Sequence, residues 1–233
     1  MSEIVLITGT RKGIGRHLVD HYLAKGCVVA GCSRGEFEGA VPANYSHFAA
    51  DVTDERAMVE MVRAVRQRFG RITVLINNAG IAAMNHLTLT PLSTVQRIFA
   101  TNVFGTFVTM RECAKAMMAE RYGRIINFAT VATPLNLEGE AGYAASKAAV
   151  ESLTRVAARE LAPFNITVNA VGPTPVMTDL IRTVPKRKMD ALIGTQAIRR
   201  MGEHRDIANV IDFFASRDSD FITGQTIYLG GIN

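Results

Sequence analysis

The stretch Thr8-Gly9-Thr10-Arg11-Lys12-Gly13-Ile14-Gly15 (TGTRKGIG) decides the fold. It follows an apolar run at residues 4–7, and residues 16–19 after it have helical spacing. Three glycines between a strand and a helix allow positive φ angles and a close approach of the backbone to a ligand. A helix N-terminus also offers free N–H groups and its positive dipole end to an anion. We therefore expect a phosphate group at this turn, beside Arg11 and Lys12.

A tight turn without any ligand is the simpler interpretation of the same glycines, and glycine spacing alone does not separate the two. The spacing is GxxxGxG, which differs from the commoner dinucleotide pattern GxGxxG. A Walker-type phosphate loop is disfavoured, because Lys12 precedes the second glycine and no Lys-Ser/Thr pair follows it.

Length and composition favour one domain over residues 1–233. The chain is 48% hydrophobic, which is enough for one large core, and it contains no linker, repeat or low-complexity segment. No apolar run is long enough to span a bilayer, and the N-terminus lacks the features of a secretory signal. The three cysteines, Cys27, Cys32 and Cys113, form no CxxC pair, which favours buried thiols in a reducing cytoplasm.

Short β-branched runs alternate with longer amphipathic stretches along the chain. The expected strands are residues 4–7, 27–32, 46–50, 72–76, 124–128, 166–171 and 226–229, and the expected helices include residues 55–69, 92–118, 142–161 and 206–215. This alternation predicts an α/β fold, a doubly wound parallel sheet of about seven strands with helices on both faces. Ligands of such a sheet bind beyond the carboxyl ends of the strands.

Tyr143 and Lys147 are four residues apart in an expected helix, so their side chains share one face. A phenol is a poor acid–base catalyst at neutral pH, and a neighbouring ammonium favours its ionised form and lowers its pKa. We therefore expect Tyr143 to exchange a proton with a carbonyl or alcohol oxygen. A solvated lysine beside an interfacial tyrosine is the alternative for an isolated pair.

Three motifs, in their order and spacing, resemble the short-chain dehydrogenase/reductase family: the TGTRKGIG turn, Asn77-Asn78-Ala79-Gly80 and Tyr143-Ala144-Ala145-Ser146-Lys147. The resemblance covers essentially the whole chain. Among family members the best match is to 3-oxoacyl-acyl-carrier-protein reductases, and a specialised ketone or sugar-like substrate is the competing interpretation, which Thr130 and Thr174 favour. It implies a Rossmann-type oxidoreductase that moves hydride between a nicotinamide cofactor and a carbonyl or alcohol, carried by a small molecule or by acyl carrier protein. A non-catalytic NADP(H)-binding sensor is the alternative, although a sensor needs no complete proton relay.

The resemblance implies four catalytic residues. In the family the lysine, here Lys147, also holds the nicotinamide ribose, and a serine hydroxyl thirteen positions before the tyrosine bonds the reacting oxygen. Thr130 stands at that position, with Thr133 as the alternative source of the hydroxyl. Asn102 matches the asparagine that anchors a water in the family's proton relay, and a buried asparagine can also bond backbone groups at a bend.

The cofactor-binding residues implied by the resemblance occur in four places. They are Gly9, Arg11, Lys12, Gly13, Ile14 and Gly15 in the glycine turn, Ser33 and Arg34 after the second strand, Asp51, Val52, Asn78, Ala79 and Gly80 after the third and fourth strands, and Tyr143, Lys147, Pro173, Val176 and Thr178. Asp51 is also a candidate cap for the helix that begins near residue 54. The histidines show no metal-ligand spacing, and we expect no metal.

Ser33 stands where NAD-preferring family members carry an acid that binds both adenosine ribose hydroxyls. A serine followed by Arg34 can accept a 2′-phosphate, and Lys12 is placed to help. We therefore expect NADP(H) to be favoured over NAD(H). Glu36 and Glu38 nearby oppose this choice, and a solvated loop charge is the alternative for Arg34.

Residues 179–204 correspond to the family's substrate lid. Thr174 replaces a glycine of the family pattern, and Pro175 after it predicts a stiff loop. The cations of the lid favour an anionic substrate or form a solvated face: Arg182, Lys186, Arg187, Lys188, Arg199 and Arg200. The resemblance also implies a homodimer or homotetramer through the helices at 92–118 and 142–161. We expect neither nucleic acid nor a membrane as a partner.

Overall fold

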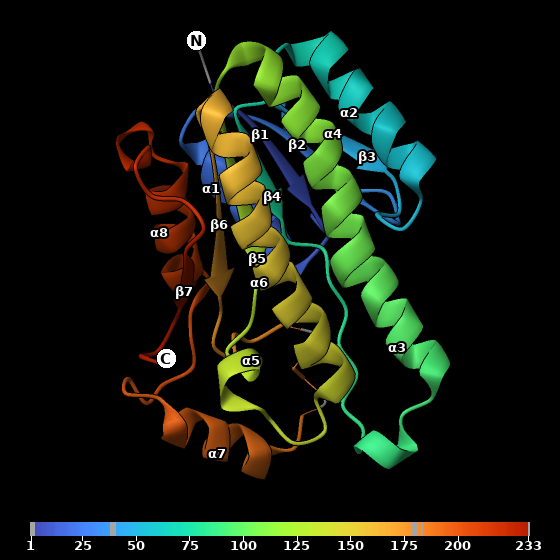
Figure 1. Ribbon diagram of the computed structural model, residues 1–233, viewed down its shortest axis with the longest axis vertical. Helices are drawn as coiled ribbons and strands as arrows, with labels where there is room; N and C mark the ends of the chain where they lie inside the picture. The colour runs from blue at the N-terminus through green and yellow to red at the C-terminus, as the bar shows by residue number, and fades with distance from the viewer. Residues whose placement is uncertain (1–2, 38–40, 179–180, 183, 233) are drawn as a thin grey trace.

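The computed structural model describes residues 3–37, 41–178, 181–182 and 184–232. In this part of the chain, seven parallel strands form one sheet in the order β3-β2-β1-β4-β5-β6-β7 (Figure 1). The strands are β1 (Ile4–Thr8), β2 (Val28–Ser33), β3 (Tyr45–Ala49), β4 (Val74–Asn77), β5 (Gly123–Phe128), β6 (Ile166–Gly172) and β7 (Thr226–Tyr228). The predicted doubly wound sheet is confirmed. The strand order reverses between β1 and β4, which is where such sheets bind ligands.

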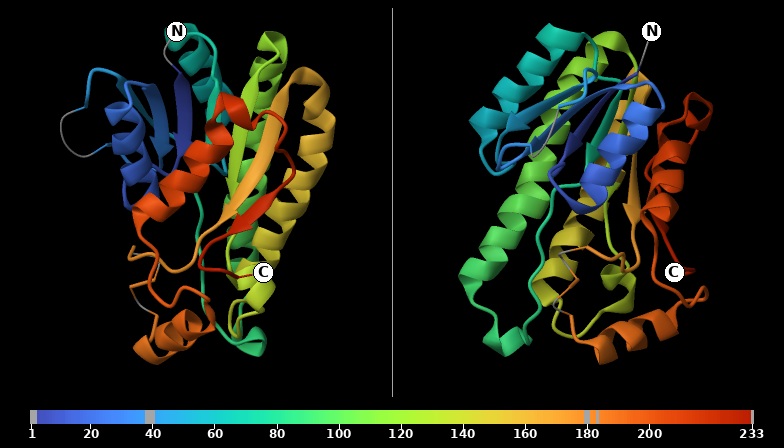
Figure 2. Two further views of the ribbon diagram at one scale, coloured as in Figure 1. Left: turned by 90° about the vertical axis from the view of Figure 1, so that its left-hand side faces the viewer. Right: turned by 180° about the vertical axis from the view of Figure 1, so that it is seen from behind.

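Helices cover both faces of the sheet, so its central strands are apolar without alternation. Leu6 and Ile125 belong to one core layer, whereas Ile7 and Ile126 belong to the other. Figure 2 shows the two layers from the side and from behind. The first contains α2 (Glu55–Phe69), α4 (Gly105–Glu120) and α6 (Ala141–Leu161), and the second contains α1 (Gly13–Ala24) and α8 (His204–Ala215).

The expected helix bounds hold at residues 55–69 and differ elsewhere for local reasons. Helix α8 begins two residues before the expected start at 206, because Glu203 and Asp206 form a reciprocal capping box. The expectation of one continuous helix over residues 92–118 is wrong in one respect. This segment divides into α3 (Leu92–Phe99), the π-helical turn η2 (Ala100–Phe104) and α4. Apolar spacing does not reveal a single π turn, which often marks a functional site.

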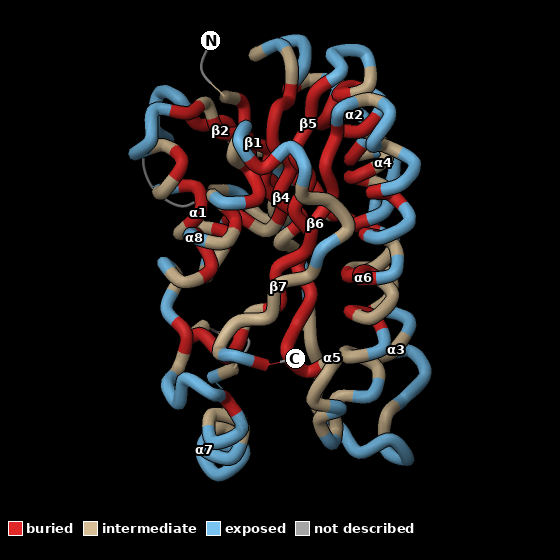
Figure 3. The backbone as a smooth tube through the Cα atoms, turned by 60° about the vertical axis from the view of Figure 1, so that its left-hand side comes forward, coloured by how far each residue is buried: buried red, intermediate tan, exposed pale blue. Residues whose placement is uncertain are grey.

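The segments beyond the carboxyl ends of the strands form the lower end of the molecule in Figure 1. Figure 3 shows the buried strands in red and the exposed helix α7 in pale blue. These segments include η1 (Leu87–Leu89), α5 (Ala132–Leu135) and α7 (Lys186–Thr195), while η3 (Ala162–Phe164) and η4 (Arg217–Ser219) are short connections elsewhere. Helix α7 belongs to the expected lid, of which residues 179, 180 and 183 lie outside the described residues. Across the described residues, no helix has the length and apolarity needed to cross a bilayer.

Candidate active site

The glycine turn joins β1 to α1 in a conformation that requires glycine. Gly9 and Gly13 have φ angles of +76° and +61°. A Cβ atom on Gly9 would lie 2.9 Å from both the Cα of Ala79 and the Nδ2 of Asn78. A Cβ atom on Gly15 would strike the carbonyl oxygen of Gly9. These positions therefore stay glycine so that the turn can pack against the segment after β4.

The segment after β4 braces the turn through hydrogen bonds. The Nδ2 of Asn78 donates to the carbonyl oxygens of Thr8 at 2.9 Å and Gly9 at 3.2 Å. The amide of Ala79 donates to the Thr8 hydroxyl at 3.0 Å. The second family motif thus holds the first motif in place.

The braced turn has the form that a dinucleotide diphosphate requires. Lys12 is the N-cap of α1 and supplies no side-chain cap, so the first-turn N–H groups face the turn. Arg11 and Lys12 are exposed. A Cβ on Gly13 would lie 3.5 Å from the methyl of Thr178, so the loop after β6 meets the turn. Ile14 instead packs against the core layer under α1. The residues present therefore fit a bound dinucleotide.

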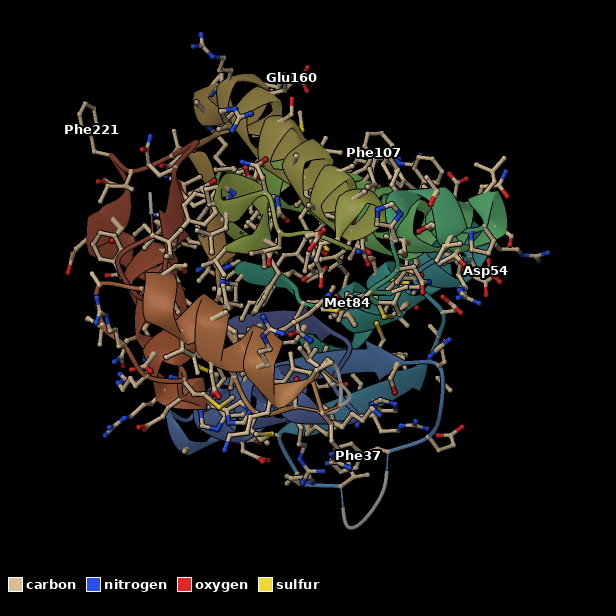
Figure 4. All side chains as sticks on the ribbon, turned by 90° about the horizontal axis from the view of Figure 1, so that it is seen from below. Phe37, Asp54, Met84, Phe107, Glu160 and Phe221 are labelled. Atoms are coloured by element: carbon tan, nitrogen blue, oxygen red, sulfur yellow. The ribbon has the colours of Figure 1, made fainter. Side chains whose placement is uncertain are left out.

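Tyr143, Lys147 and Thr130 come together beyond the carboxyl end of β5. The hydroxyls of Thr130 and Tyr143 form a hydrogen bond. One helical turn further along α6, the buried Nζ of Lys147 donates to the carbonyl oxygen of Phe128 at 2.8 Å. Figure 4 looks onto this end of the sheet, with Met84 near its middle and Phe37 at the edge beside the first strands.

The expectation that Lys147 lowers the pKa of Tyr143 is wrong. Burial raises the pKa of Tyr143 to about 12; the Thr130 hydrogen bond lowers it in part, and the charge of Glu140 raises it further. Burial also lowers the pKa of Lys147 to about 8, against the attraction of Glu151. The reason is that desolvation dominates both groups and the amine donates to a carbonyl. At neutral pH the phenol is therefore protonated, which is the form that donates to a carbonyl oxygen.

Asn102 connects three parts of the site from within the π turn. Its Oδ1 accepts from the amide of Ile81 at 2.9 Å, and its Nδ2 donates to the carbonyl oxygen of Ile81 at 2.9 Å. The Nδ2 also donates to the Ser146 hydroxyl at 3.0 Å, which donates to the carbonyl oxygen of Tyr143 at 2.7 Å. A Cβ on Gly80 would lie 3.4 Å from the Oδ1 of Asn102 and 3.6 Å from the Nζ of Lys147. The sequence analysis assigned no role to Ser146. The signal was its position in the motif Tyr143-Ala144-Ala145-Ser146-Lys147, on the same expected helix.

The two candidate threonine hydroxyls differ in their partners. The Thr130 hydroxyl bonds Tyr143 and accepts from the amide of Ala132 at 3.2 Å. The buried Thr133 hydroxyl has no hydrogen-bond partner among the described residues. The geometry therefore joins Thr130, rather than Thr133, to Tyr143.

The segment after β3 contains Asp51 and Val52, which were expected to bind the cofactor, and Asp54. The Oδ1 of Asp51 accepts from the amide and hydroxyl of Thr53, both at 2.9 Å. Asp54 caps α2 by accepting from the amide of Ala57 at 3.0 Å, so the capping role considered for Asp51 belongs to Asp54. Val52 is buried against Gly105 at the start of α4.

A hydrogen-bond network follows β2 and includes residues that the sequence did not suggest. The Ser33 hydroxyl donates to the carbonyl oxygen of Gly35 at 2.8 Å, and Arg34 between them is exposed. A Cβ on Gly35 would lie 2.6 Å from the Nη1 of Arg11, so the guanidinium lies against this turn. His47 of β3 contacts both Ser33 and Gly35. Glu36 is exposed, and Glu38 lies outside the described residues.

The loop after β6 is fixed at both ends. The carbonyl oxygen of Pro173 accepts from the amide of Val131 at 3.3 Å, and Val176 forms a parallel bridge with Gly202. The Thr174 hydroxyl donates to the side-chain carbonyl of the buried Gln196. Threonine at this position therefore holds Gln196, the C-cap residue of α7, against the loop after β6.

The cations of the expected lid segment divide into those with a partner and those that are exposed. Arg200 forms a bidentate pair with Asp206 at 2.7 and 2.9 Å, and this pairing holds the pKa of Asp206 at about 2. The Nζ of Lys188 lies 3.8 Å from the Sδ of Met84. Lys186, Arg187 and Arg199 are exposed on or beside α7. The cysteines are buried, and no cluster of metal-ligating side chains occurs among the described residues.

Comparisons with known proteins agree with this geometry. The family profile described as Enoyl-(Acyl carrier protein) reductase matches residues 9–232. The chain is 33% identical over 235 residues to 3-oxoacyl-(acyl-carrier-protein) reductase FabG of Escherichia coli, covering 98% of this chain and 96% of that protein. It is 35% identical over 240 residues to FabG of Staphylococcus epidermidis, covering 99% and 98%.

Solved structures are similar over the same extent. The NADP-bound structure of ElxO superposes with a TM-score of 0.89 at 31% identity, covering 98% of this chain and 97% of that one. A tyrosine-to-phenylalanine variant of ElxO, solved with NADPH bound, gives a TM-score of 0.90 at 31% identity over the same shares. The aldohexose dehydrogenase of Thermoplasma acidophilum gives 0.89 at 28% identity, covering 99% and 94%.

Proposed function

The chain belongs to the short-chain dehydrogenase/reductase family and is an NAD(P)-dependent oxidoreductase acting on carbonyl or alcohol groups, and from this premise we propose that it reduces 3-oxoacyl thioesters with NADPH. The observation that carries the proposal is a protonated phenol, Tyr143, bonded to Thr130 one helical turn from the buried amine of Lys147. A carbonyl held beside Tyr143 receives the proton that reduction requires.

The residues divide the work of the reaction among them. Bound NADPH supplies the hydride. The N-terminus of α1 and the glycine turn hold the diphosphate, and Lys147 holds the nicotinamide ribose. Tyr143 donates its proton to the substrate oxygen, while Thr130 fixes the position of that oxygen. Asn102 and Ser146 hold the backbone around Tyr143 and connect it to the segment after β4.

The thioester substrate has two supports. The relatives from Escherichia coli and Staphylococcus epidermidis named above are 3-oxoacyl-acyl-carrier-protein reductases, and they match this chain over nearly their whole length. The exposed cations of α7 also form a positive surface beside the site, which favours an acidic carrier protein. The proposal also includes a single domain over residues 1–233, in which residues 179–204 form a substrate lid.

The test is NADPH oxidation, followed by absorbance, with 3-oxoacyl thioesters, simple ketones, quinones and keto sugars, each repeated with NADH. We expect the highest kcat/KM with a 3-oxoacyl thioester and NADPH. A higher kcat/KM with a keto sugar would change the proposed substrate and leave the proposed reduction of a carbonyl unchanged. Tight NADPH binding without turnover of any carbonyl would instead indicate a sensor and contradict the proposal.

Thr130→Val is expected to lower kcat by about 100-fold, because it removes a hydroxyl that positions the reacting oxygen and keeps the side-chain shape. Thr130→Ser should retain most of the activity. Thr133→Val is the matched control, since its hydroxyl has no partner among the described residues. Steady-state kinetics of the three variants decide between the hydroxyls, and a larger loss in Thr133→Val would reverse the assignment.

Arg34→Asp is expected to lower kcat/KM with NADPH by roughly 100-fold and to change the value with NADH far less. The variant replaces an attraction for the 2′-phosphate with a repulsion, and a charged hydrogen bond of this kind contributes about 1.5–3 kcal/mol. Arg63→Asp, an exposed change on α2, controls for net charge. Equal losses with both cofactors would assign Arg34 a role unrelated to the phosphate.

Assembly into a homodimer or homotetramer is also part of the proposal. Leu87, Leu89 and Leu92 are 70%, 74% and 71% exposed, and Phe104 is 61% exposed. They lie at or near η1, α3 and η2. A pocket of about 430 Å³ lies between His86, Leu87 and the alanines of α6, which are Ala141, Ala144, Ala145 and Ala148. A second copy would remove this apolar surface from water. Sedimentation showing only monomers would contradict assembly.

The buried cysteines support a reducing compartment, and we place the protein in the cytoplasm.

A further inference from the structure

His47 lies in β3, where the turn formed by Ser33, Arg34 and Gly35 meets the interior of the sheet. This turn is the expected site of the 2′-phosphate. It stands opposite Gly31 in the β2–β3 register, with Tyr45 two residues earlier on the same face. A Cβ on Gly31 would lie 2.5 Å from the Tyr45 hydroxyl and 2.7 Å from the Thr10 hydroxyl, so glycine leaves room for these groups to meet. The imidazole thus connects a buried pair of hydroxyls to the exposed turn.

The hydrogen bonds of His47 determine where its proton lies. Its Nε2 is 2.9 Å from the carbonyl oxygen of Gly35, which only accepts, so Nε2 carries a hydrogen. The same nitrogen is 3.1 Å from the Ser33 hydroxyl. Its Nδ1 is 2.9 Å from the Tyr45 hydroxyl. The ring therefore fixes the turn that contains Ser33 and Arg34.

The other side of the ring meets two buried hydroxyls from different elements. The Tyr45 hydroxyl lies 2.9 Å from Nδ1 and 3.0 Å from the Thr10 hydroxyl. The Thr10 hydroxyl donates to the carbonyl oxygen of Cys32 at 3.3 Å. The imidazole is therefore held between this buried network and the Ser33–Gly35 turn.

The charges around His47 are mostly positive. From α1, Arg16 lies 4.4 Å above the ring of Phe37, which packs against His47 with ring centroids 5.7 Å apart. Asp20 pairs with Arg16 at 3.3 Å and offsets part of its charge. From the glycine turn, Arg11 lies against Gly35. These cations lie beside the turn that His47 holds, where they would attract a phosphate group.

We propose that His47 is a positioning residue of the 2′-phosphate site, which holds the Ser33–Gly35 turn through its contacts with Ser33 and Gly35. The inference rests on the proposed preference for NADPH. It predicts that discrimination between NADPH and NADH resides partly in a histidine of β3 that does not belong to the family motifs. Histidine suits this role because its two ring nitrogens can bond the turn and the buried hydroxyls at the same time.

Two variants test whether the hydrogen bonds of His47 hold the turn. His47→Ala should raise the Kd for NADPH by about tenfold, since the turn loses its anchor, while the Kd for NADH stays within about twofold. Glutamine can donate to Gly35 and accept from Tyr45. His47→Gln should therefore keep the Kd for NADPH within about threefold of the wild type.

Titration of the wild type and both variants with NADPH and with NADH, followed by fluorescence, measures these effects directly. If the wild type prefers NADPH but His47→Ala keeps the wild-type Kd for NADPH, or loses affinity for NADPH and NADH equally, the role of His47 is overturned and the proposed function stands. If the wild type shows no preference for NADPH, both are overturned.

Discussion

Tyr143→Phe is expected to lower kcat by about 10³-fold while the Kd for NADPH stays within about threefold of the wild type. The ring of phenylalanine fills the same space, so the loss comes from the hydroxyl alone. That hydroxyl is the proton donor, and at neutral pH it is fully protonated because burial raises its pKa to about 12. Stopped-flow measurement of NADPH oxidation gives the first quantity, and fluorescence titration gives the second.

Tyr122→Phe is the matched control for this variant. Tyr122 lies just before β5, at the end of that strand opposite the candidate site, and its buried hydroxyl has no hydrogen-bond partner among the described residues. Its removal should leave kcat unchanged. Turnover of Tyr143→Phe at the wild-type rate would remove Tyr143 from the mechanism, whereas loss of NADPH binding would assign it a structural role.

Lys147→Met is expected to have opposite effects on activity and stability. Activity should fall by at least 100-fold, because the amine that holds the ribose is lost. The free energy of unfolding at pH 7 should rise by about 2 kcal/mol, since methionine fills a similar volume and removes a buried ammonium. Denaturant unfolding and steady-state kinetics test the two parts. Lys115→Met, with a side chain 62% exposed on α4, is the control for loss of a surface charge.

The stability effect of Lys147→Met has a defined pH dependence. The pKa of Lys147 in the folded protein is about 8, below the ordinary value of 10.5. Below pH 8 the amine is charged in both the folded and unfolded states, so its burial opposes folding in full. Between pH 8 and 10.5 the folded state loses its proton first, and this cost disappears. The advantage of Lys147→Met should therefore shrink across that range. A constant difference would mean that Lys147 carries no desolvation cost.

Much of the fold could be predicted from the sequence, because the strongest signals are local. Apolar runs and glycine or acidic boundaries indicated the strands and the bounds of α2. The π turn could not be predicted, since one additional residue in a helix barely alters the apolar spacing. Its cause is distant in sequence: Asn102 bonds the backbone of Ile81 and the hydroxyl of Ser146.

The site was predictable as a set of residue types and much less as a set of contacts. The glycines, Tyr143 and Lys147 carry recognisable spacing, and the structure brings them to one end of the sheet. Their protonation depends on burial, which no motif encodes, so the direction of the Tyr143 pKa shift was wrong. His47 carries no motif, because its partners Thr10, Ser33 and Gly35 come from other segments. Pairings of this kind appear only after the sheet has formed.

The most direct test of the central claim is a crystal structure of the protein with NADP⁺. The account predicts that the diphosphate lies on Gly13 and Gly15 at the start of α1, with the amine of Lys147 on the nicotinamide ribose and the hydroxyl of Tyr143 facing the ring. A dinucleotide bound elsewhere, or Tyr143 and Lys147 directed away from the nicotinamide, would contradict it.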